Sequence, residues 1–368
     1  TVGRILLEAA LARMPQGRRL TDEQLLGHIC LVQPDFPPDL AAVLSDAIAP
    51  EPAHRPPDAV ALWERLAQAQ ASHTVRTTAP IPDLARWELG HDTHIGLYKS
   101  RLGQINQDHL FYQSAGRIGI LVVADGISIS TAGSGNLAST ILIQVIASLW
   151  EGQKEELRTG SDARLRAFLD EALAVANNTI CNGSLRLADG KLSQHIPMGT
   201  TAVVALFQGA NVHIATLGDS RAYLIGRSGV GILTGDQNLR GEWLRSWQTD
   251  APIDLHNEGH ALVGYAGHFD TDGTPEPLSA VIRKLRLLPG ESLLLCSDGL
   301  NDYAADSHAA LARLIQTAMQ KKNPTEASRE LVGYANAGGG GDNVTVLIAT
   351  CTGTVSYTHL TLPTKRGV

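Results

Sequence analysis

A chain of 368 residues, 43% of them hydrophobic, is long enough to bury a large core, and its length suggests two units. Its 37 acidic and 30 basic residues give a formal net charge of −7, which argues against a nucleic-acid-binding surface. No apolar run reaches the ~20 residues of a membrane span, and we expect no secretory signal. The four cysteines are widely separated and form no CxxC pair, so we expect a reducing, cytoplasmic setting.

The first seventy residues show helical periodicity throughout. From Val2, apolar residues recur at i, i+3, i+4 and i+7, which is the spacing of one helix face. A second helix is predicted to begin at Thr21, which opens a capping-box sequence. A third is predicted after Pro37-Pro38 and a fourth after Pro56-Pro57, because proline suits the first helical turn. We therefore assign residues 1–70 to an all-helical segment.

Two stretches are predicted to lie outside any domain. From Ala71 to Asp83 the periodicity fails and Ser, Thr and Pro dominate, so we assign residues 71–86 to a linker. Residues 354–368 change composition abruptly and resemble a translated sequencing-library adapter, so we expect this tail to be extraneous. Residues 87–353 are left as the main domain.

Within the main domain, short β-rich runs alternate with amphipathic helices. The predicted strands are Ile118–Ala124, Thr201–Phe207, Val212–Leu217, Arg221–Ile225, Ser292–Cys296 and Val344–Thr350. The predicted helices are Leu137–Trp150, Ala163–Asn177, Ala309–Met319 and Thr325–Ala335. Because several successive strands are joined by short turns, we expect an α+β fold of mostly antiparallel sheets with helices outside.

Four predicted strands are flanked by a turn that holds an aspartate beside a glycine. These turns carry Asp125, Asp219, Asp298 and Asp342. A rigid strand can aim such a carboxylate, and carboxylates gathered at one edge would repel one another unless cations lay between them. Mg²⁺ and Mn²⁺ prefer oxygen ligands, and two such ions ~3.5–4 Å apart can activate water against a phosphoryl group. One Asp-Gly pair is usually plain turn chemistry, but four at core strands predict a metal site.

Seven stretches, in order, resemble the metal-dependent protein phosphatases, the type 2C Ser/Thr phosphatases in their bacterial form. They are INQD (Ile105–Asp108), VVADG (Val122–Gly126), PMGTTAVVAL (Pro197–Leu206), LGDSRAYLI (Leu217–Ile225), LTGDQN (Leu233–Asn238), LPGESLLLCSDGLND (Leu288–Asp302) and GGGDNVTVLIA (Gly339–Ala349). The resemblance implies a central antiparallel β-sandwich flanked by helices, with the metal site at one end. It also implies a signalling hydrolase that removes phosphate from phosphoserine and phosphothreonine in protein substrates, using two Mg²⁺ or Mn²⁺ ions.

The resemblance also implies which residues hold the metals. Asp125 bridges both ions, Asp298 and Asp342 complete the first, and the Gly126 carbonyl helps to hold the second. Asp219, together with Asp298, binds a third and weaker ion.

The phosphate side of the site departs from the family pattern. Asp108 matches the residue that orients a metal-bound water, but Gln107 stands where many members carry glutamate. The arginine expected five residues before Asp108 is Gly103. We assign phosphate binding to Arg101, with Lys99 as the less favoured alternative, because the arginine fork matches phosphate oxygens.

The helical segment resembles the end of the C-lobe of a eukaryotic-like protein kinase. The matching stretches are Thr1–Ala10 and Phe36–Leu66, with Arg55-Pro56 as an Arg-Pro pair. The segment has no kinase catalytic lysine, catalytic loop or DFG sequence, so the resemblance implies a cognate kinase in the same polypeptide instead of kinase activity here. The alternative is a four-helix regulatory extension. In either case we expect the segment to be separable from the main domain.

Two other functions compete with phosphate hydrolysis. Gly218-Asp219-Ser220 comes near the nucleophile elbow of a serine hydrolase, but an elbow needs a following helix and Arg221–Ile225 is typical of a strand. We therefore expect a hairpin turn in which Ser220 is structural. The second rival is a catalytically silent phosphatase-like module that binds phosphoproteins. Gly103 and the altered loop Ile127–Gly135 favour this rival, whereas the intact aspartates oppose it.

Overall fold

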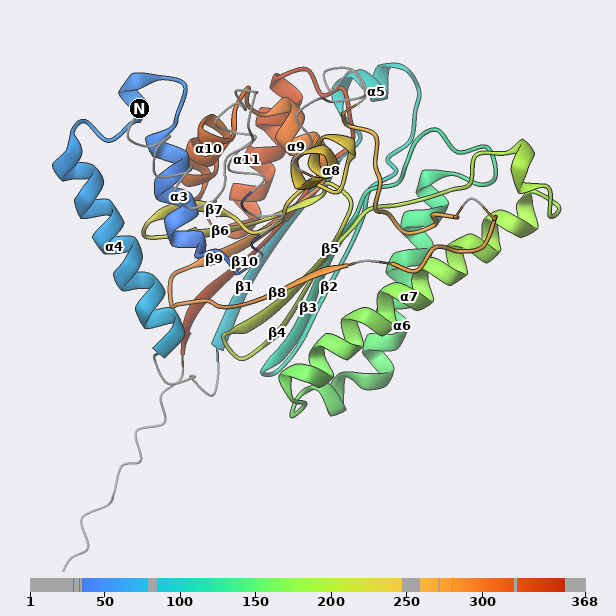
Figure 1. Cartoon of the computed structure of the whole chain (residues 1–368), viewed down its shortest axis with the longest axis horizontal. Helices are drawn as coiled ribbons and strands as arrows, with labels where there is room; N and C mark the ends of the chain where they lie inside the picture. Colours follow the sequence, from blue (N-terminus) through green and yellow to red (C-terminus); the bar gives the residue numbers. More distant parts are fainter. Residues whose placement is uncertain are drawn as a thin grey trace, which may run out of the picture.

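Two five-stranded antiparallel sheets pack face to face and are flanked by helices on both outer faces (Figure 1). The computed structural model describes Ile29, Gln33 and residues 35–78, 85–246, 259–270, 272–278, 280–320 and 323–354. The observed arrangement confirms the predicted α+β sandwich. Within the described ranges, none of the helices is both long enough and apolar enough to cross a bilayer.

Every strand pairing in the two sheets is antiparallel. The first sheet has the order β1 (Ala85–His94), β10 (Val344–Thr354), β9 (Ser292–Cys296), β6 (Arg221–Gly226) and β7 (Gly229–Ile232). The second has the order β2 (His109–Ala115), β3 (Ile118–Ala124), β4 (Ala202–Gln208), β5 (Asn211–Leu217) and β8 (Val281–Arg286).

The continuous apolar runs arise because the central strands are buried on both faces. In β9, Leu293 and Leu295 point into the core between the two sheets, while Leu294 and Cys296 point to the core under the outer helices. The same alternation divides β3, where Leu121 faces the inter-sheet core. Such a strand needs apolar side chains at every position, which explains why the sequence predicted β3 and β9 with correct bounds.

Long helices cover the outer faces of the sheets (Figure 1). Helices α6 (Gly135–Leu157) and α7 (Asp162–Leu187) pack on the second sheet, and α9 (Asp298–Tyr303), α10 (His308–Gln320) and α11 (Pro324–Ala337) pack on the first. Side chains cap three of these helices: Ser134 for α6, Ser161 for α7 and Asn323 for α11. The shorter helices are α5 (Leu97–Arg101), α8 (Leu239–Ser246), η1 (Pro52–His54) and η2 (Leu192–Gln194).

The helices expected after the two proline pairs are present as α3 (Pro38–Ala47) and α4 (Ala59–Thr78). The expected loss of helical structure at Ala71 is wrong, because α4 continues to Thr78. Its last turns are held by Arg76, which is buried, and by threonine hydroxyls that donate to carbonyls one turn back. The helices predicted from Val2 and Thr21, and the tail after Thr354, lie outside the described residues.

Two further expectations are corrected by the fold. The Gly218–Ser220 turn is not a hairpin, because β5 and β6 belong to different sheets and the turn carries the chain from one to the other. Separability of the helical segment is opposed by α3, whose Leu44 and Ile48 share one core with β6, β7 and β9. At the predicted boundary between the linker (residues 71–86) and the main domain (residues 87–353), β1 already begins at Ala85, and Ala85 pairs with Thr354.

Candidate metal centre

The predicted acidic residues converge because antiparallel pairing brings the ends of their strands together. His109 at the start of β2 pairs with Ala124 at the end of β3. Asp108, just before His109, and Asp125, just after Ala124, therefore lie at the same end of this strand pair. Asp298 follows β9 and Asp342 precedes β10, and these two strands are also neighbours. The cluster therefore lies at one end of the sandwich, as the sequence predicted.

The backbone of Asp125 is fixed from both sides. Its carbonyl accepts hydrogen bonds from the Thr201 N–H (2.8 Å) and the Thr200 hydroxyl (2.8 Å), and its N–H donates to Thr201 Oγ1 (3.1 Å). Thr201 Oγ1 also lies 2.7 Å from Ser220 Oγ, and Ser220 is buried. These contacts hold the Asp125 carboxylate at the end of a rigid strand and give Ser220 a structural role.

The loop after Asp125 folds back so that its first residue, Gly126, packs tightly against Gly135. A Cβ placed on Gly126 would lie 2.2 Å from the Gly135 carbonyl oxygen, so only glycine fits there. The Ile127 N–H donates to the Gly199 carbonyl (2.9 Å), and Gly126 forms an isolated β-bridge with Thr200. The unusual sequence Ile127–Gly135 is thus accommodated beside the acidic cluster without displacing Gly126.

Burial and mutual repulsion raise the pKa of the clustered carboxyls. The pKa of Asp108 is raised to about 6, and burial is the largest cause. The Ser297 hydroxyl, which donates to Oδ2 (2.7 Å), lowers this pKa, and the nearby charge of Asp342 raises it. The pKa values of Asp125 and Asp298 lie well above the ordinary range, first through burial and then through neighbouring carboxylates. Groups that resist ionisation in this way are stabilised as carboxylates by cations.

Two carboxylate oxygens in the cluster are buried without a hydrogen-bond partner among the described residues: Asp108 Oδ1 and Asp298 Oδ1. A buried polar atom without a partner is destabilising, and a hard cation or its bound water would satisfy both oxygens. In the described part of the chain, no three acidic, histidine or cysteine side chains are close enough to form a closed ligand set. The donor chemistry nevertheless fits hard divalent cations, since the available groups are carboxylates and carbonyls.

A basic side chain reaches the cluster from α5. Lys99 Nζ forms an ion pair with Asp342. The loop that carries Asp342 holds α5 in place, because the Gly340 carbonyl accepts the Tyr98 N–H (2.9 Å). Arg101, the basic residue favoured from the sequence, is exposed at the end of α5 and contacts none of the described carboxylates. The structure therefore brings Lys99, not Arg101, to the acidic cluster.

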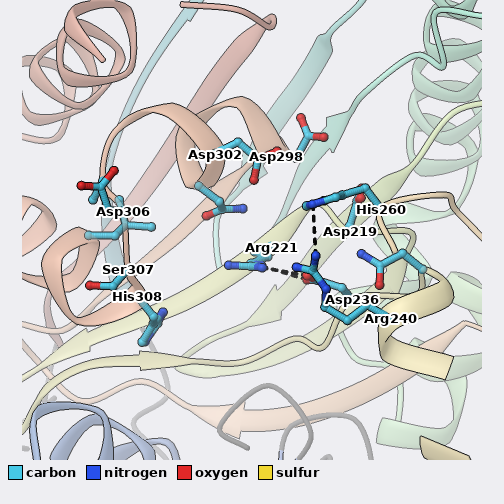
Figure 2. Close-up of a pocket in the computed structure, with 14 residues that line it drawn as sticks. Asp219, Arg221, Asp236, Arg240, His260, Asp298, Asp302, Asp306, Ser307 and His308 are labelled. Atoms are coloured by element: carbon cyan, nitrogen blue, oxygen red, sulfur yellow. Dashed lines mark hydrogen bonds and ion pairs between the residues drawn. The ribbon is translucent and has the colours of Figure 1, made fainter. Parts of the chain in front are cut away.

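Asp219 joins the cluster from the opposite side and lines a pocket of about 260 Å³ (Figure 2). Burial, followed by repulsion from Asp236, raises the Asp219 pKa to about 7. Arg221 forms two hydrogen bonds with Asp236, at 2.8 and 2.7 Å. Asp298 lines the same pocket, so Asp219 and Asp298 face one space.

Sequence reasoning missed several residues of this pocket: Arg221, Asp236, Arg240, His260 and Asp302. Asp302 follows Asp298 by one helical turn, and this i, i+4 spacing would have placed both on the same side of a helix. Arg240 and His260, whose side chains lie 3.3 Å apart, had no comparable sequence indication because 20 positions separate them in the chain (Figure 2).

Comparison with known proteins places this site in context. The family model described as protein phosphatase 2C matches residues 95–334. The serine/threonine phosphatase stp of Listeria innocua is 26% identical over 255 residues, which cover 68% of this chain and 92% of that protein. The serine/threonine protein phosphatase PstP of Mycobacterium tuberculosis is 30% identical over 231 residues, which cover 62% of this chain and 40% of that protein.

Solved structures show the same architecture. The crystal structure of the Mycobacterium tuberculosis serine/threonine phosphatase PstP/Ppp is similar with a TM-score of 0.56 and 26% identity, covering 73% of this chain and 100% of that one. The catalytic domain of PstP in complex with two manganese ions gives a TM-score of 0.54 at 26% identity, covering 72% of this chain and 97% of that one.

Proposed function

The chain belongs to the protein phosphatase 2C family, and we propose that it hydrolyses phosphoserine and phosphothreonine in proteins with the help of two Mg²⁺ or Mn²⁺ ions. The observation that carries this proposal is the cluster of Asp108, Asp125, Asp298 and Asp342 at one end of the sandwich. Burial and mutual repulsion raise the pKa of three of its members, and two of its buried oxygens have no described hydrogen-bond partner.

We assign the metal ligands as follows. Asp125 would hold both ions, a role supported by the hydrogen bonds that fix its backbone on both sides. Asp298 and Asp342 complete the first site, and the Gly126 carbonyl contributes to the second. Asp219, facing the same pocket as Asp298, takes a third and weaker ion. When bound, such ions lower the pKa of a coordinated water toward ~7 and offset charge on the phosphoryl oxygens.

Asp108 is assigned to orient the attacking water. Its Oδ2 is occupied by the Ser297 hydroxyl, which leaves the buried Oδ1 able to accept a hydrogen bond from a water molecule. Asp108 thus positions the nucleophile while other groups hold the phosphate.

Lys99 is assigned as the cation that holds the substrate phosphate, in place of the arginine missing at Gly103. It is the basic side chain of α5 that reaches the acidic cluster, through Asp342, whereas Arg101 is exposed. A lysine acts as a point charge without the two-pronged geometry of arginine, so we expect weaker orientation of the phosphate.

The helices α3 and α4 support the proposal that a kinase-like segment precedes the phosphatase in one signalling polypeptide. Helix α3 lies within the stretch Phe36–Leu66 that resembles the end of a kinase C-lobe, and α4 begins within it. We also keep the proposal of a cytoplasmic setting, since Cys181, Cys296 and Cys351 are buried free thiols.

The test is hydrolysis of a phosphothreonine peptide and of p-nitrophenyl phosphate with added Mn²⁺ or Mg²⁺. Turnover that needs the metal supports the proposal. A folded protein that binds metal and phosphopeptide without turnover would favour the silent binding module.

A further inference from the structure

The helices before β1 are bound to the phosphatase through a shared core. We call residues 35–78, which contain α3, η1 and α4, the helical arm. On the arm, Ala41, Leu44 and Ile48 are buried in one cluster with residues of β7 and α10, namely Val230, Ile232, Leu311, Ala312 and Ile315. Figure 1 shows α3 beside β7 at the edge of the sheet. The arm therefore covers apolar side chains of the edge strand β7 that would otherwise be exposed.

A buried ion cluster crosses the boundary between the arm and the phosphatase. Arg76 of α4 contacts Asp39 of α3 at 3.1 Å and Glu291, in the turn before β9, at 2.6 Å. The side chains of Arg76, Asp39 and Glu291 are only 4%, 1% and 5% exposed. A buried charge is tolerated only with its partners in place, so Glu291 depends on the arm and the arm depends on Glu291.

The phosphatase strand β7 is shaped to receive α3. A Cβ on Gly231 would lie 2.3 Å from the Pro38 carbonyl oxygen, which is too close for any side chain. Gly229 has a φ of +126° and faces Ala42, whose Cβ would be 3.3 Å from an added Cβ. These glycines let the arm approach the β7 backbone, so the fit is built into both sides of the contact.

The arm also reaches the pocket beside the metal centre through α10. Arg313 of α10 donates a hydrogen bond to the His54 carbonyl of the arm (2.7 Å). Leu311 of α10 belongs to the core that contains α3, and it also lines the pocket that holds Asp219 and Asp298. Figure 2 shows Ser307 and His308, at the start of this helix, on the wall of the same pocket. One helix thus contacts the arm with one face and the pocket with its N-terminal end.

We propose that the helical arm is an intramolecular coupling element that stays docked on the phosphatase and, through α10, sets the shape of the pocket beside Asp219. A ligand or partner that displaces the arm would then change how the pocket receives a protein substrate while leaving the metal-ligand aspartates in place. The site of control is the junction of α3, β7 and the Arg76–Glu291 contact.

The docking is tested by cutting the chain between the arm and β1. A protease site is inserted between Thr78 and Ala85, the purified chain is cleaved, and the products are separated by native size-exclusion chromatography. We expect the fragment up to Thr78 to co-elute with the phosphatase. A wild-type fragment that elutes alone would overturn the proposal, whatever the variants do.

Matched substitutions locate the contact. In the cut protein we expect Gly231→Ala and Arg76→Met to release most of the fragment. Gly333→Ala is the glycine control, because a Cβ there meets nothing within 4 Å, and Arg55→Met is the arginine control, because Arg55 donates to the Ala49 and Pro50 carbonyls, which lie in the arm itself. If the Gly231→Ala and Arg76→Met proteins retain the cleaved fragment as fully as the two control proteins do, the assigned junction is contradicted.

The coupling is tested with the uncut Gly231→Ala chain. We expect kcat/KM for a phosphothreonine peptide to fall by about 2- to 30-fold relative to Gly333→Ala, with unchanged bound metal by elemental analysis. Equal values would refute coupling. This readout alone rests on the proposed function, and fragment retention decides the docking even if no variant, wild type included, hydrolyses a phosphoester.

Discussion

Lys99 and Asp342 form an ion pair although 243 positions separate them in the chain. The contact arises because the Gly340 carbonyl in the loop before β10 accepts the Tyr98 N–H, and Asn336 Oδ1 of α11 accepts the Leu97 N–H. A helix near the start of the domain is thereby held against elements near its end. The contact places a positive charge beside a carboxylate assigned to the metal centre. This pair is the reason why Lys99, and not the Arg101 favoured by the sequence, is proposed to bind the phosphate.

Replacing Lys99 by Met should lower kcat/KM for p-nitrophenyl phosphate by roughly 10- to 100-fold, because a hydrogen bond to a charged group contributes about 1.5–3 kcal/mol. Arg101→Met is the matched control and should stay near wild type, since Arg101 is exposed. Lys99→Arg should restore much of the activity. Equal losses in the two Met variants would show that Lys99 has no special role.

Asp219→Asn should stabilise the metal-free protein at pH 8 but not near pH 3. The folded pKa of Asp219 is about 7 against an ordinary value of 3.8, so the native state keeps a proton that the unfolded chain releases between these values. Wild-type stability is therefore lost as pH rises from about 4 to 7, and Asn, which stays neutral, avoids a loss on the order of 2–4 kcal/mol. Urea titrations in EDTA at both pH values measure the difference. An equal effect at both would contradict the assignment.

The same Asp219→Asn variant should keep both central ions. The carboxylate is assigned to a third, peripheral ion, so the variant should need more metal for phosphopeptide turnover while elemental analysis still finds the two central ions. If both central ions are lost, Asp219 belongs to the central site instead.

Ser220→Ala should leave the metal-dependent activity intact. Ser220 is buried and its hydroxyl contacts Thr201 Oγ1 at 2.7 Å, so its loss should lower the free energy of unfolding by roughly 1 kcal/mol. Chemical denaturation and a p-nitrophenyl phosphate assay measure the two effects. A covalent phosphoserine at position 220, detected by mass spectrometry after turnover, would contradict a water-based mechanism.

The sequence predicted the central strands well because these strands are buried on both faces. β3 and β9 are short, nearly continuous apolar runs, and every residue in them is buried. The strands it missed, β1, β2, β7 and β8, are the edge strands of the two sheets. Two of them show the weaker pattern: β8 (VIRKLR) mixes apolar and basic residues, and β1 (ARWELGHDTH) is largely polar. Edge strands need only one buried face, so their sequence gives less indication of their structure.

The clustering of the aspartates assigned to the metals could be predicted because each lies next to a strand end, whereas the contacts around them depend on the tertiary fold. Nothing near Gly103 indicates that Lys99 instead of Arg101 turns toward Asp342, since that depends on how the loop before β10 holds α5. Likewise, Arg76 looked like part of a linker, and its burial becomes evident only when Glu291 is brought beside it. Long-range ion pairs of this kind leave no local pattern.

The most direct test of the central claim is the metal dependence of p-nitrophenyl phosphate hydrolysis in wild type and in Asp125→Asn. Asp125 is assigned to both ions, so the variant should lose activity by several orders of magnitude, and wild-type turnover should require Mn²⁺ or Mg²⁺ and stop with EDTA. Circular dichroism of the variant serves as the control for folding. Wild-type activity that survives EDTA, or an active Asp125→Asn variant, would contradict the two-metal account.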